Sequence, residues 1–263
     1  MYTRDLAGFM PVATFRFYAE LNDFLPPERR YTEFAYGFLD VATVKDRIQS
    51  FGVPHTEVDL ILANGEPVDF AYRVRDGDRI GVYPVFEAFD ISGLTRVRPH
   101  PLRDPRFVLD VHLGRLAAYL RMLGFDAGYR SHCTDERMAE ISRGEHRILL
   151  TRDVGLLKRG AVTHGHYVRA TKPRQQLVEV VERFDLARLT KPFSRCLKCN
   201  TPLAPADKEQ VRHQLPAQVA LLHDEFLRCP DCGRAYWKGG HLRRMRDLVQ
   251  ASIQGTDEAG VGQ

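Results

Sequence analysis

The stretch RILLTRD (147–153) is a short apolar run that ends in a cation and an anion. Its residues 148–151 are typical of a strand buried on both faces, as found in a parallel sheet covered by helices. A carboxylate placed directly after such a strand has two roles open to it. Asp153 can cap the following helix, or it can present an acid to a ligand. The neighbouring strands must decide between these roles.

Strands and helices alternate on both sides of this stretch. The expected strands are 106–111, 125–131, 147–153 and 164–170. The expected helices are 113–124, 134–146, 154–160 and 175–186. This order predicts an α/β domain over residues 95–190, with a parallel sheet in three layers. Ligands of such sheets bind beyond the carboxyl ends of the strands.

Three acids fall at that edge of the predicted sheet. Asp110 ends the first strand, Asp153 follows the third, and Asp135 begins the helix after the second. If the first strand lies between the second and third, as right-handed crossovers permit, the three carboxylates converge. Carboxylates held close together repel one another unless a hard cation such as Mg²⁺ or Mn²⁺ neutralises them. Such an ion can orient a water molecule and stabilise charge on a phosphate.

Each of these acids also has a structural interpretation. Asp153 could be a helix N-cap, and Asp135 a first-turn acid favoured by the helix dipole. Asp110 is harder to explain in this way, because it interrupts an apolar strand where a lone carboxylate is costly. For a fourth acid, Glu136 is preferred over Asp126, which lies nearer the opposite edge of the sheet.

The charge of the chain is unevenly distributed. Residues 1–93 contain 9 Lys and Arg against 15 Asp and Glu, whereas residues 94–174 contain 16 against 8. The basic middle segment indicates a domain that meets a polyanion, although arginines could also simply solvate helix faces. Arg152 could grip a phosphate oxygen or steady the carboxylates, and Arg115 is a similar candidate.

Four of the five cysteines form two pairs with metal-ligand spacing. These residues are Cys196, Cys199, Cys229 and Cys232. Each pair fits a turn that directs two thiolates at one Zn²⁺, and four thiolates leave no open position, which predicts a structural zinc site. The fifth, Cys133, stands alone and is expected to be a packing residue.

The first unit, residues 11–90, shows a different order of elements. Strand patterns flank a helix at 43–54, and turns are expected at Asn64-Gly65 and Asp76-Gly77. This order resembles the ubiquitin-like β-grasp fold, closest to the small sulfur-carrier proteins. Those carriers need a free C-terminal Gly-Gly, whereas Gly239-Gly240 lies inside the chain. A docking or scaffolding role toward a protein partner is therefore expected instead of carrier chemistry.

Three stretches together resemble a known family. They are FVLDVHLGRLAAYLRMLGFDAGY (107–129), TDERMAEISRGEHRILLTRD (134–153) and CPDCGRAYWKGGHLRRM (229–245). They are similar to the Mut-seven C-terminal ribonuclease domain, a PIN-like nuclease family often preceded in bacteria by a ubiquitin-like domain. The resemblance covers about residues 12–248. It implies that Asp110, Asp135 and Asp153 bind Mg²⁺ or Mn²⁺ and that the domain cleaves single-stranded RNA.

The third unit, residues 191–250, is expected to be a zinc ribbon followed by a basic helix, with a disordered tail at 251–263. Its adjacent aromatics, Tyr236 and Trp237, could stack on single-stranded nucleic acid, or could pack the ribbon onto the nuclease domain. The residues expected to bind RNA are Arg115, Arg152, Arg243 and Arg244.

The leading prediction is therefore a metal-dependent ribonuclease. Two alternatives remain: a non-catalytic RNA-binding module built on the zinc ribbon, and a receiver-like phosphoacceptor switch. The second lacks an acidic pair at the end of the first strand, and Lys172 comes only after the fourth strand. No apolar run approaches the roughly 20 residues of a membrane helix, and no signal peptide is evident, so a cytoplasmic location is expected.

Overall fold

The computed structural model describes residues 10–84, 96–97 and 105–237. The chain divides into two compact units. The first comprises Met1–Leu102 with Leu157–Gly160, and the second comprises Arg103–Leu156 with Ala161–Gln263. The predicted basic helix with Arg243 and Arg244, and the predicted disordered tail, lie outside the described residues.

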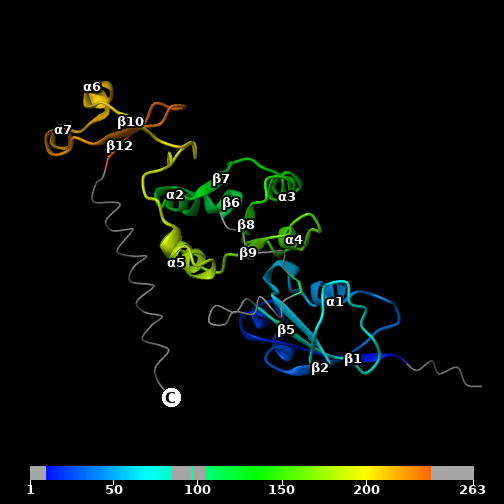
Figure 1. The fold of residues 1–263 in the computed structure, drawn as a ribbon. Helices are drawn as coiled ribbons and strands as arrows, with labels where there is room; N and C mark the ends of the chain where they lie inside the picture. Colours follow the sequence, from blue (N-terminus) through cyan, green and yellow to red (C-terminus); the bar gives the residue numbers. More distant parts are fainter. Residues whose placement is uncertain (1–9, 85–95, 98–104, 238–263) are drawn as a thin grey trace, which may run out of the picture. The chain divides into compact units, whose positions relative to one another are not determined.

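The first unit contains a five-stranded mixed sheet in the order β2-β1-β5-β3-β4 (Figure 1). The strands are β1 Val12–Phe17, β2 Glu33–Gly37, β3 Leu60–Ala63, β4 Glu66–Pro67 and β5 Arg79–Tyr83. The helices are α1 Val44–Ser50 and the 3-10 turns η1 Ala19–Phe24, η2 Pro27–Arg29 and η3 His55–Glu57. The central strands β1 and β5 run parallel and the other pairs are antiparallel. This is the predicted ubiquitin-like sheet.

Local signals explain these elements. Helix α1 begins with a capping box, in which the Thr43 hydroxyl accepts from the backbone N–H of Asp46 and the Asp46 carboxylate accepts from that of Thr43. The hairpin between β3 and β4 turns on Asn64 and Gly65, both in the left-handed region (φ 54° and 90°). Alternate residues of β1 and β5 face a core that also contains Ile48 of α1.

The second unit is built on a four-stranded parallel sheet in the order β7-β6-β8-β9. Its strands are β6 Arg106–Leu109, β7 Asp126–Tyr129, β8 Ile148–Thr151 and β9 Gly165–Tyr167. Its helices are η4 Val111–Leu113, α2 Gly114–Met122, α3 Asp135–Gly144, α4 Val154–Lys158, α5 Pro173–Arg183 and η5 Ala187–Leu189. Strand β6 therefore lies between β7 and β8, which is the arrangement that the convergence of the three acids requires.

The order of the strands sets the layers. The chain moves from β6 to β7 in one direction and then from β7 to β8 in the other, so right-handed crossovers place α2 and α3 on opposite faces. Helices α2 and α5 contact each other, α3 packs on β6 and β8, and the helices are seen on both sides of the sheet (Figure 1). Leu149 and Leu150 of β8 are completely buried, which fits a strand covered on both faces. The predicted three-layer α/β fold is confirmed.

The cysteine pairs belong to a small antiparallel sheet in the order β10-β11-β12. Its strands are β10 Ala204–Ala206, β11 Phe226–Arg228 and β12 Ala235–Tyr236. Short helices lie between β10 and β11, namely α6 Lys208–Val211, η6 Arg212–Gln214 and α7 Ala217–Leu222. Among the described residues, no helix has the length and apolar character needed to cross a bilayer.

Candidate functional site

The carboxyl edge of the parallel sheet contains a topological switch point. Strands β6 and β8 are neighbours, but the chain leaves β6 toward β7 and leaves β8 toward β9. Loops that depart in opposite directions open a crevice between the two strand ends, where open α/β sheets bind their ligands. Asp110 directly follows β6, and Asp153 follows β8 by two residues. The two acids thus lie on either side of the switch point.

Asp110 is a buried acid with little compensation. The residue is 7% exposed, and the Thr151 hydroxyl donates to its Oδ2 at 2.7 Å. Its backbone N–H continues the sheet by donating to the Leu150 carbonyl at 3.0 Å. The described residues provide no other hydrogen bond to this carboxylate. Because a buried carboxylate normally has several partners, Oδ1 is available to a ligand.

Asp153 takes the first of the two roles considered from the sequence, that of a helix cap, and keeps one carboxylate oxygen for the second. Its Oδ1 accepts from the backbone N–H groups of Gly155 and Leu156 at 2.7 and 3.4 Å, which caps helix α4. Within the described part of the chain, Oδ2 accepts no hydrogen bond, and the residue is exposed. The backbone N–H of Asp153 donates to the Thr151 hydroxyl at 2.9 Å. Thr151, which the sequence analysis did not single out, therefore connects Asp110 to Asp153.

The other two predicted acids lie in the first turn of α3, after β7. Asp135 is half-buried and Glu136 is exposed, and Thr134 caps this helix by accepting from the backbone N–H of Arg137 at 3.3 Å. The acids share an edge of the sheet, but among the described residues no three of them bring their oxygens within 4.8 Å of one another. Among the described residues, the four cysteines do form such a group, because their sulfur atoms all lie within 4.8 Å of one another.

Arg152 holds the loop that follows β9. Its Nη1 donates to the carbonyl oxygens of Val168, Arg169 and Ala170 at 3.0, 2.8 and 2.8 Å. From the sequence, Arg152 was expected to bind a phosphate oxygen or to stabilise the carboxylates. The structure shows that one of its terminal nitrogens fixes the backbone beside the site. Arg115, in the first turn of α2, is exposed.

The carboxylate of Glu179, in α5, binds the backbone N–H groups of the same loop. Its Oε1 and Oε2 accept from the backbone N–H groups of Arg169 and Ala170, each at 2.8 Å, and His166 Nε2 lies 2.9 Å from Oε1. Burial opposes ionisation, but these hydrogen bonds prevail and lower the pKa of Glu179. Sequence reasoning missed this residue, because nothing local distinguishes it from other helix acids.

The opposite edge of the sheet carries a second set of charges. Asp126, at the start of β7, is paired with Arg147 (Oδ1 to Nη1, 2.6 Å). It also accepts from Asn200 Nδ2 at 2.6 Å, and Arg195 Nη2 lies 3.5 Å from its Oδ2. The prediction that Asp126 lies away from the acids at the carboxyl edge agrees with its position at the start of a strand.

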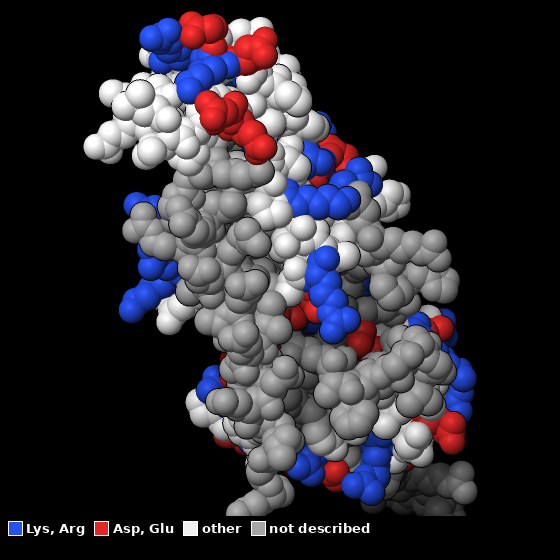
Figure 2. All heavy atoms as spheres, turned by 60° about the vertical axis from the view of Figure 1, so that its left-hand side comes forward, with Lys and Arg blue, Asp and Glu red and all other residues white. Residues whose placement is uncertain are grey.

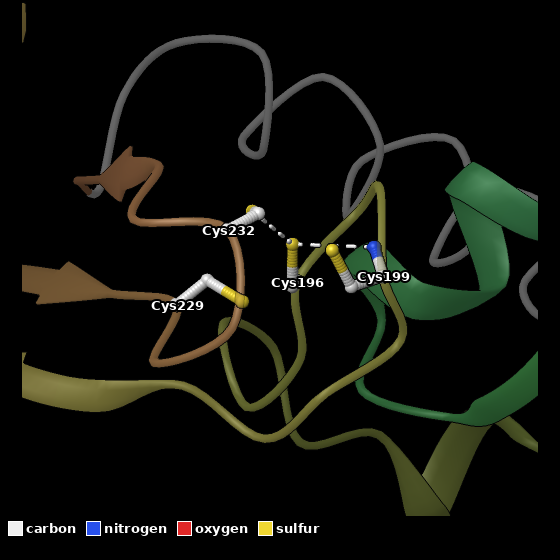
Figure 3. Close-up of side chains that lie close together, drawn as sticks. All are labelled: Cys196, Cys199, Cys229 and Cys232. Atoms are coloured by element: carbon white, nitrogen blue, oxygen red, sulfur yellow. Dashed lines mark hydrogen bonds between the residues drawn. The ribbon is translucent and has the colours of Figure 1, made fainter.

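The four cysteines turn toward one another from two loops (Figure 3). The Sγ atoms of Cys196 and Cys232 are 3.7 Å apart. A tetrahedral Zn²⁺ with Zn–S bonds of about 2.3 Å separates its sulfurs by about 3.8 Å, so the spacing fits zinc. Burial opposes ionisation of Cys196, but hydrogen bonds from Tyr236 and nearby backbone N–H groups lower its pKa to about 6. The donor set and geometry suit a structural zinc ion.

The aromatic residues of this module are packing residues. Tyr236 is buried against Cys196 and Cys229, and its hydroxyl lies 3.1 Å from Cys196 Sγ. Trp237 packs against a second apolar cluster centred on Val211 and Phe226. Both aromatics pack within the core of the module itself. The expectation that they pack the ribbon onto the nuclease domain is therefore corrected to packing inside the ribbon.

The charges of the segment between the cysteine pairs are of both signs. Lys208 pairs with Asp224 at 3.1 Å, and Arg212 pairs with Glu209 at 3.2 Å. Figure 2 shows acidic and basic side chains side by side at the outer end of the module. A mixed surface of this kind at the outer end of the module does not favour a polyanion there.

These features define a class of protein: a PIN-like α/β domain with acids at its carboxyl edge, joined to a four-cysteine zinc-ribbon module and to a ubiquitin-like sheet. Comparison with family models agrees. The model described as "Mut7-C RNAse domain" matches residues 105–249, and the model described as "Mut7-C ubiquitin" matches residues 10–90. The chain belongs to the Mut7-C RNAse domain family. No curated protein and no solved structure matches it.

Proposed function

We propose that this protein is a metal-dependent ribonuclease that hydrolyses phosphodiester bonds of single-stranded or structured RNA at the carboxyl edge of its parallel sheet. Family membership indicates a ribonuclease. The observation that carries the proposal is Asp110, a buried carboxylate at the switch point whose one hydrogen bond from the described residues comes from Thr151. A fold keeps such an uncompensated acid at the cost of stability when the acid has a function.

The donor set at this edge fits a hard cation. Asp110 and Asp153 each have a carboxylate oxygen without a hydrogen bond from the described residues, and oxygen is the ligand that Mg²⁺ and Mn²⁺ prefer. Mg²⁺ is commonly held by one or two carboxylates and keeps several waters, so it does not require all three acids in direct contact. We assign Asp110 and Asp153 as its principal ligands, with Asp135 and Glu136 acting through water.

A cation bound here would supply charge stabilisation at the phosphate and a lowered pKa for the attacking water. The residues of the chain do the rest. The Thr151 hydroxyl fixes the orientation of the Asp110 carboxylate, and its bond to the backbone of Asp153 fixes the second acid relative to the first. Carboxylates whose orientation is fixed before the substrate binds would lower the cost of positioning the attacking water.

Exposed cations on either side of the acids would hold the RNA phosphates. Arg115 and Arg130 follow β6 and β7, and Lys172 and Arg174 follow β9. In this proposal Arg152 and Glu179 act as positioning residues, because they fix the loop that leads to Lys172. Phosphate contacts of this kind give affinity without sequence preference. Arg243 and Arg244 of the C-terminal segment would add to them.

The decisive experiment uses labelled single-stranded RNA with the full-length protein. We expect cutting with Mn²⁺ or Mg²⁺, no cutting with EDTA, and no cutting by the Asp110→Asn or Asp153→Asn variants. The matched control is Asp185→Asn, which replaces an exposed acid that follows the last turn of α5. RNA binding without cutting under any metal would instead support the RNA-binding module. Stable phosphorylation of Asp110 by a small phosphodonor would support the phosphoacceptor switch.

We also propose a cytoplasmic location, because a four-thiolate zinc site requires reduced cysteines. Fluorescence of a tagged chain in the source cell tests this location. For the ubiquitin-like unit we propose a protein partner. The proposed domain boundaries are 11–90 for this unit, 95–190 for the nuclease domain and 191–250 for the zinc ribbon with its basic helix. Limited proteolysis tests these boundaries, which predict cuts between residues 90 and 95 and close to residue 190.

A further inference from the structure

A buried arginine joins the zinc module to the α/β sheet. Arg121, in the last turn of α2, is 4% exposed. Its Nε donates to the Ala127 carbonyl of β7 at 2.8 Å. Its Nη1 donates to the carbonyls of Leu197 and Lys198 at 2.9 and 3.0 Å. One guanidinium therefore spans an edge strand of the sheet and the loop between Cys196 and Cys199.

That loop carries two of the four thiolates that would bind zinc. Leu197 and Lys198 are the two residues between the first pair of cysteines, and the backbone N–H of Cys199 turns inward to the Cys196 sulfur at 3.4 Å. Chelation by both cysteines would hold the loop closed, with its carbonyls directed at Arg121. A buried guanidinium without acceptors is costly, so the loop and the arginine stabilise each other.

A second side chain makes the same connection. Asn200 directly follows Cys199, and its Nδ2 donates to Asp126 Oδ1 at 2.6 Å while its Oδ1 accepts from the Ala127 N–H at 3.1 Å. Strand β7 is at the edge of its sheet, where N–H and C=O groups lack a neighbouring strand. Asn200 and Arg121 satisfy both backbone groups of Ala127. At Ala127, side chains thus take the place of a further strand at the open edge of β7.

We propose that Arg121 couples zinc binding at the four cysteines to the order of β7. Four thiolates and one Zn²⁺ carry a net charge of about −2, which the neighbouring guanidinium complements. Strand β7 ends at Tyr129, whose hydroxyl donates to the carbonyl of Val111 at 2.9 Å, one residue beyond Asp110. The coupling therefore reaches the carboxyl edge, and Arg121 is a positioning residue for it.

Hydrogen–deuterium exchange of the full-length protein, without RNA, tests this coupling. Removal of zinc by a chelator should increase exchange about tenfold or more in peptides covering β7 and the end of α2, since buried hydrogen bonds to a charged group are lost. Peptides covering β1 and β5 should not change. In the Arg121→Gln variant with zinc bound, β7 should exchange as fast as in the zinc-free protein, with zinc content still near one ion per chain by mass spectrometry.

Two further variants keep the result decisive. Asn200→Ala should give a smaller increase at β7, and Lys208→Gln, whose ion pair with Asp224 is exposed, should give none. Protection of β7 that survives either zinc removal or Arg121→Gln would overturn the proposal. If Arg121→Gln does not fold, zinc removal and Asn200→Ala test the coupling in its place. Unchanged exchange protection of β7 in both experiments would then overturn the proposal. Because no RNA is present, the outcome does not depend on whether the protein is a nuclease.

Discussion

The two edges of the parallel sheet carry the same kinds of residues and use them differently. At the amino edge, Asp126 is bound by Arg147 and Asn200, so its charge is compensated within the fold. At the carboxyl edge, Asp110 is more deeply buried than Asp126 but receives one hydrogen bond from the described residues, from Thr151. An acid whose charge is compensated by neighbouring residues indicates a structural role. A buried acid with a carboxylate oxygen that accepts no hydrogen bond from the described residues indicates a functional role.

The largest expected effect is that of Asp110→Asn. We predict that RNA cleavage falls about thousandfold or more, because the amide neither binds a cation nor holds a water as a carboxylate does. Stability should be unchanged or slightly higher, since a buried charge is removed. Single-turnover cleavage and thermal unfolding measure the two quantities. A variant that cuts at the wild-type rate would contradict the assignment of this edge as the active site.

Loss of one zinc ligand is expected to be the next largest effect. Cys229 is buried at the centre of the four-cysteine cluster. Cys229→Ser should release the zinc ion and destabilise the second unit by more than about 3 kcal/mol, because metal binding is folding free energy in small metal-bound modules. Cys133→Ser is the control and should keep both zinc content and stability. A zinc-free protein that unfolds at the same denaturant concentration as the loaded one would contradict this prediction.

Asp126→Asn tests the compensated edge with the same chemical change as Asp110→Asn. We predict a loss of about 2 kcal/mol in stability, because Arg147 and Arg195 lose a half-buried partner. The cleavage rate per folded molecule should stay within about threefold of the wild type, since the residue is remote from the reacting edge. Denaturant unfolding and cleavage at low temperature separate these effects. The comparison between the edges fails if the folded variant no longer cuts.

Arg152→Lys distinguishes a positioning role from a direct one. Lysine offers a point charge instead of a planar fork and cannot reproduce the fixed contacts to three carbonyls after β9. We predict that KM for RNA rises about threefold to tenfold while kcat changes little, because the loop that leads to Lys172 is loosened. Arg143→Lys, at the exposed end of α3, is the control. A large fall in kcat would show instead that Arg152 acts on the reacting phosphate.

The smallest effect concerns acid stability. Burial opposes ionisation of Asp126, but hydrogen bonds from Arg147 and Asn200 prevail and hold its pKa below the usual value of 3.8. A group whose pKa is lowered by folding contributes stability above its unfolded pKa and loses it as pH falls through its folded pKa. The wild type should therefore lose stability more steeply than Asp126→Asn below about pH 4. Parallel acid-unfolding curves for the two proteins would contradict this account.

Sequence periodicity predicted the elements of both sheets closely. The expected helix at 113–124 is α2 at Gly114–Met122, and the expected strand in RILLTRD is β8 at Ile148–Thr151. These elements are local, so apolar spacing and stop signals are sufficient to find them. The network around the site was not predictable in this way. Thr151, Glu179 and Arg121 act through partners distant in the sequence, and no local pattern marks such residues.

By itself the sequence determined the order of the strands and helices, the cysteine pairs and the acids that follow the strands, because these depend on residue type and spacing along the chain. The tertiary structure decided which acid is compensated and which is left open. It brought Asn200 to Asp126 and Thr151 to Asp110, and it directed Arg121 between a zinc loop and an edge strand. Compensation of charge is a property of distance in space, which spacing along the chain does not specify.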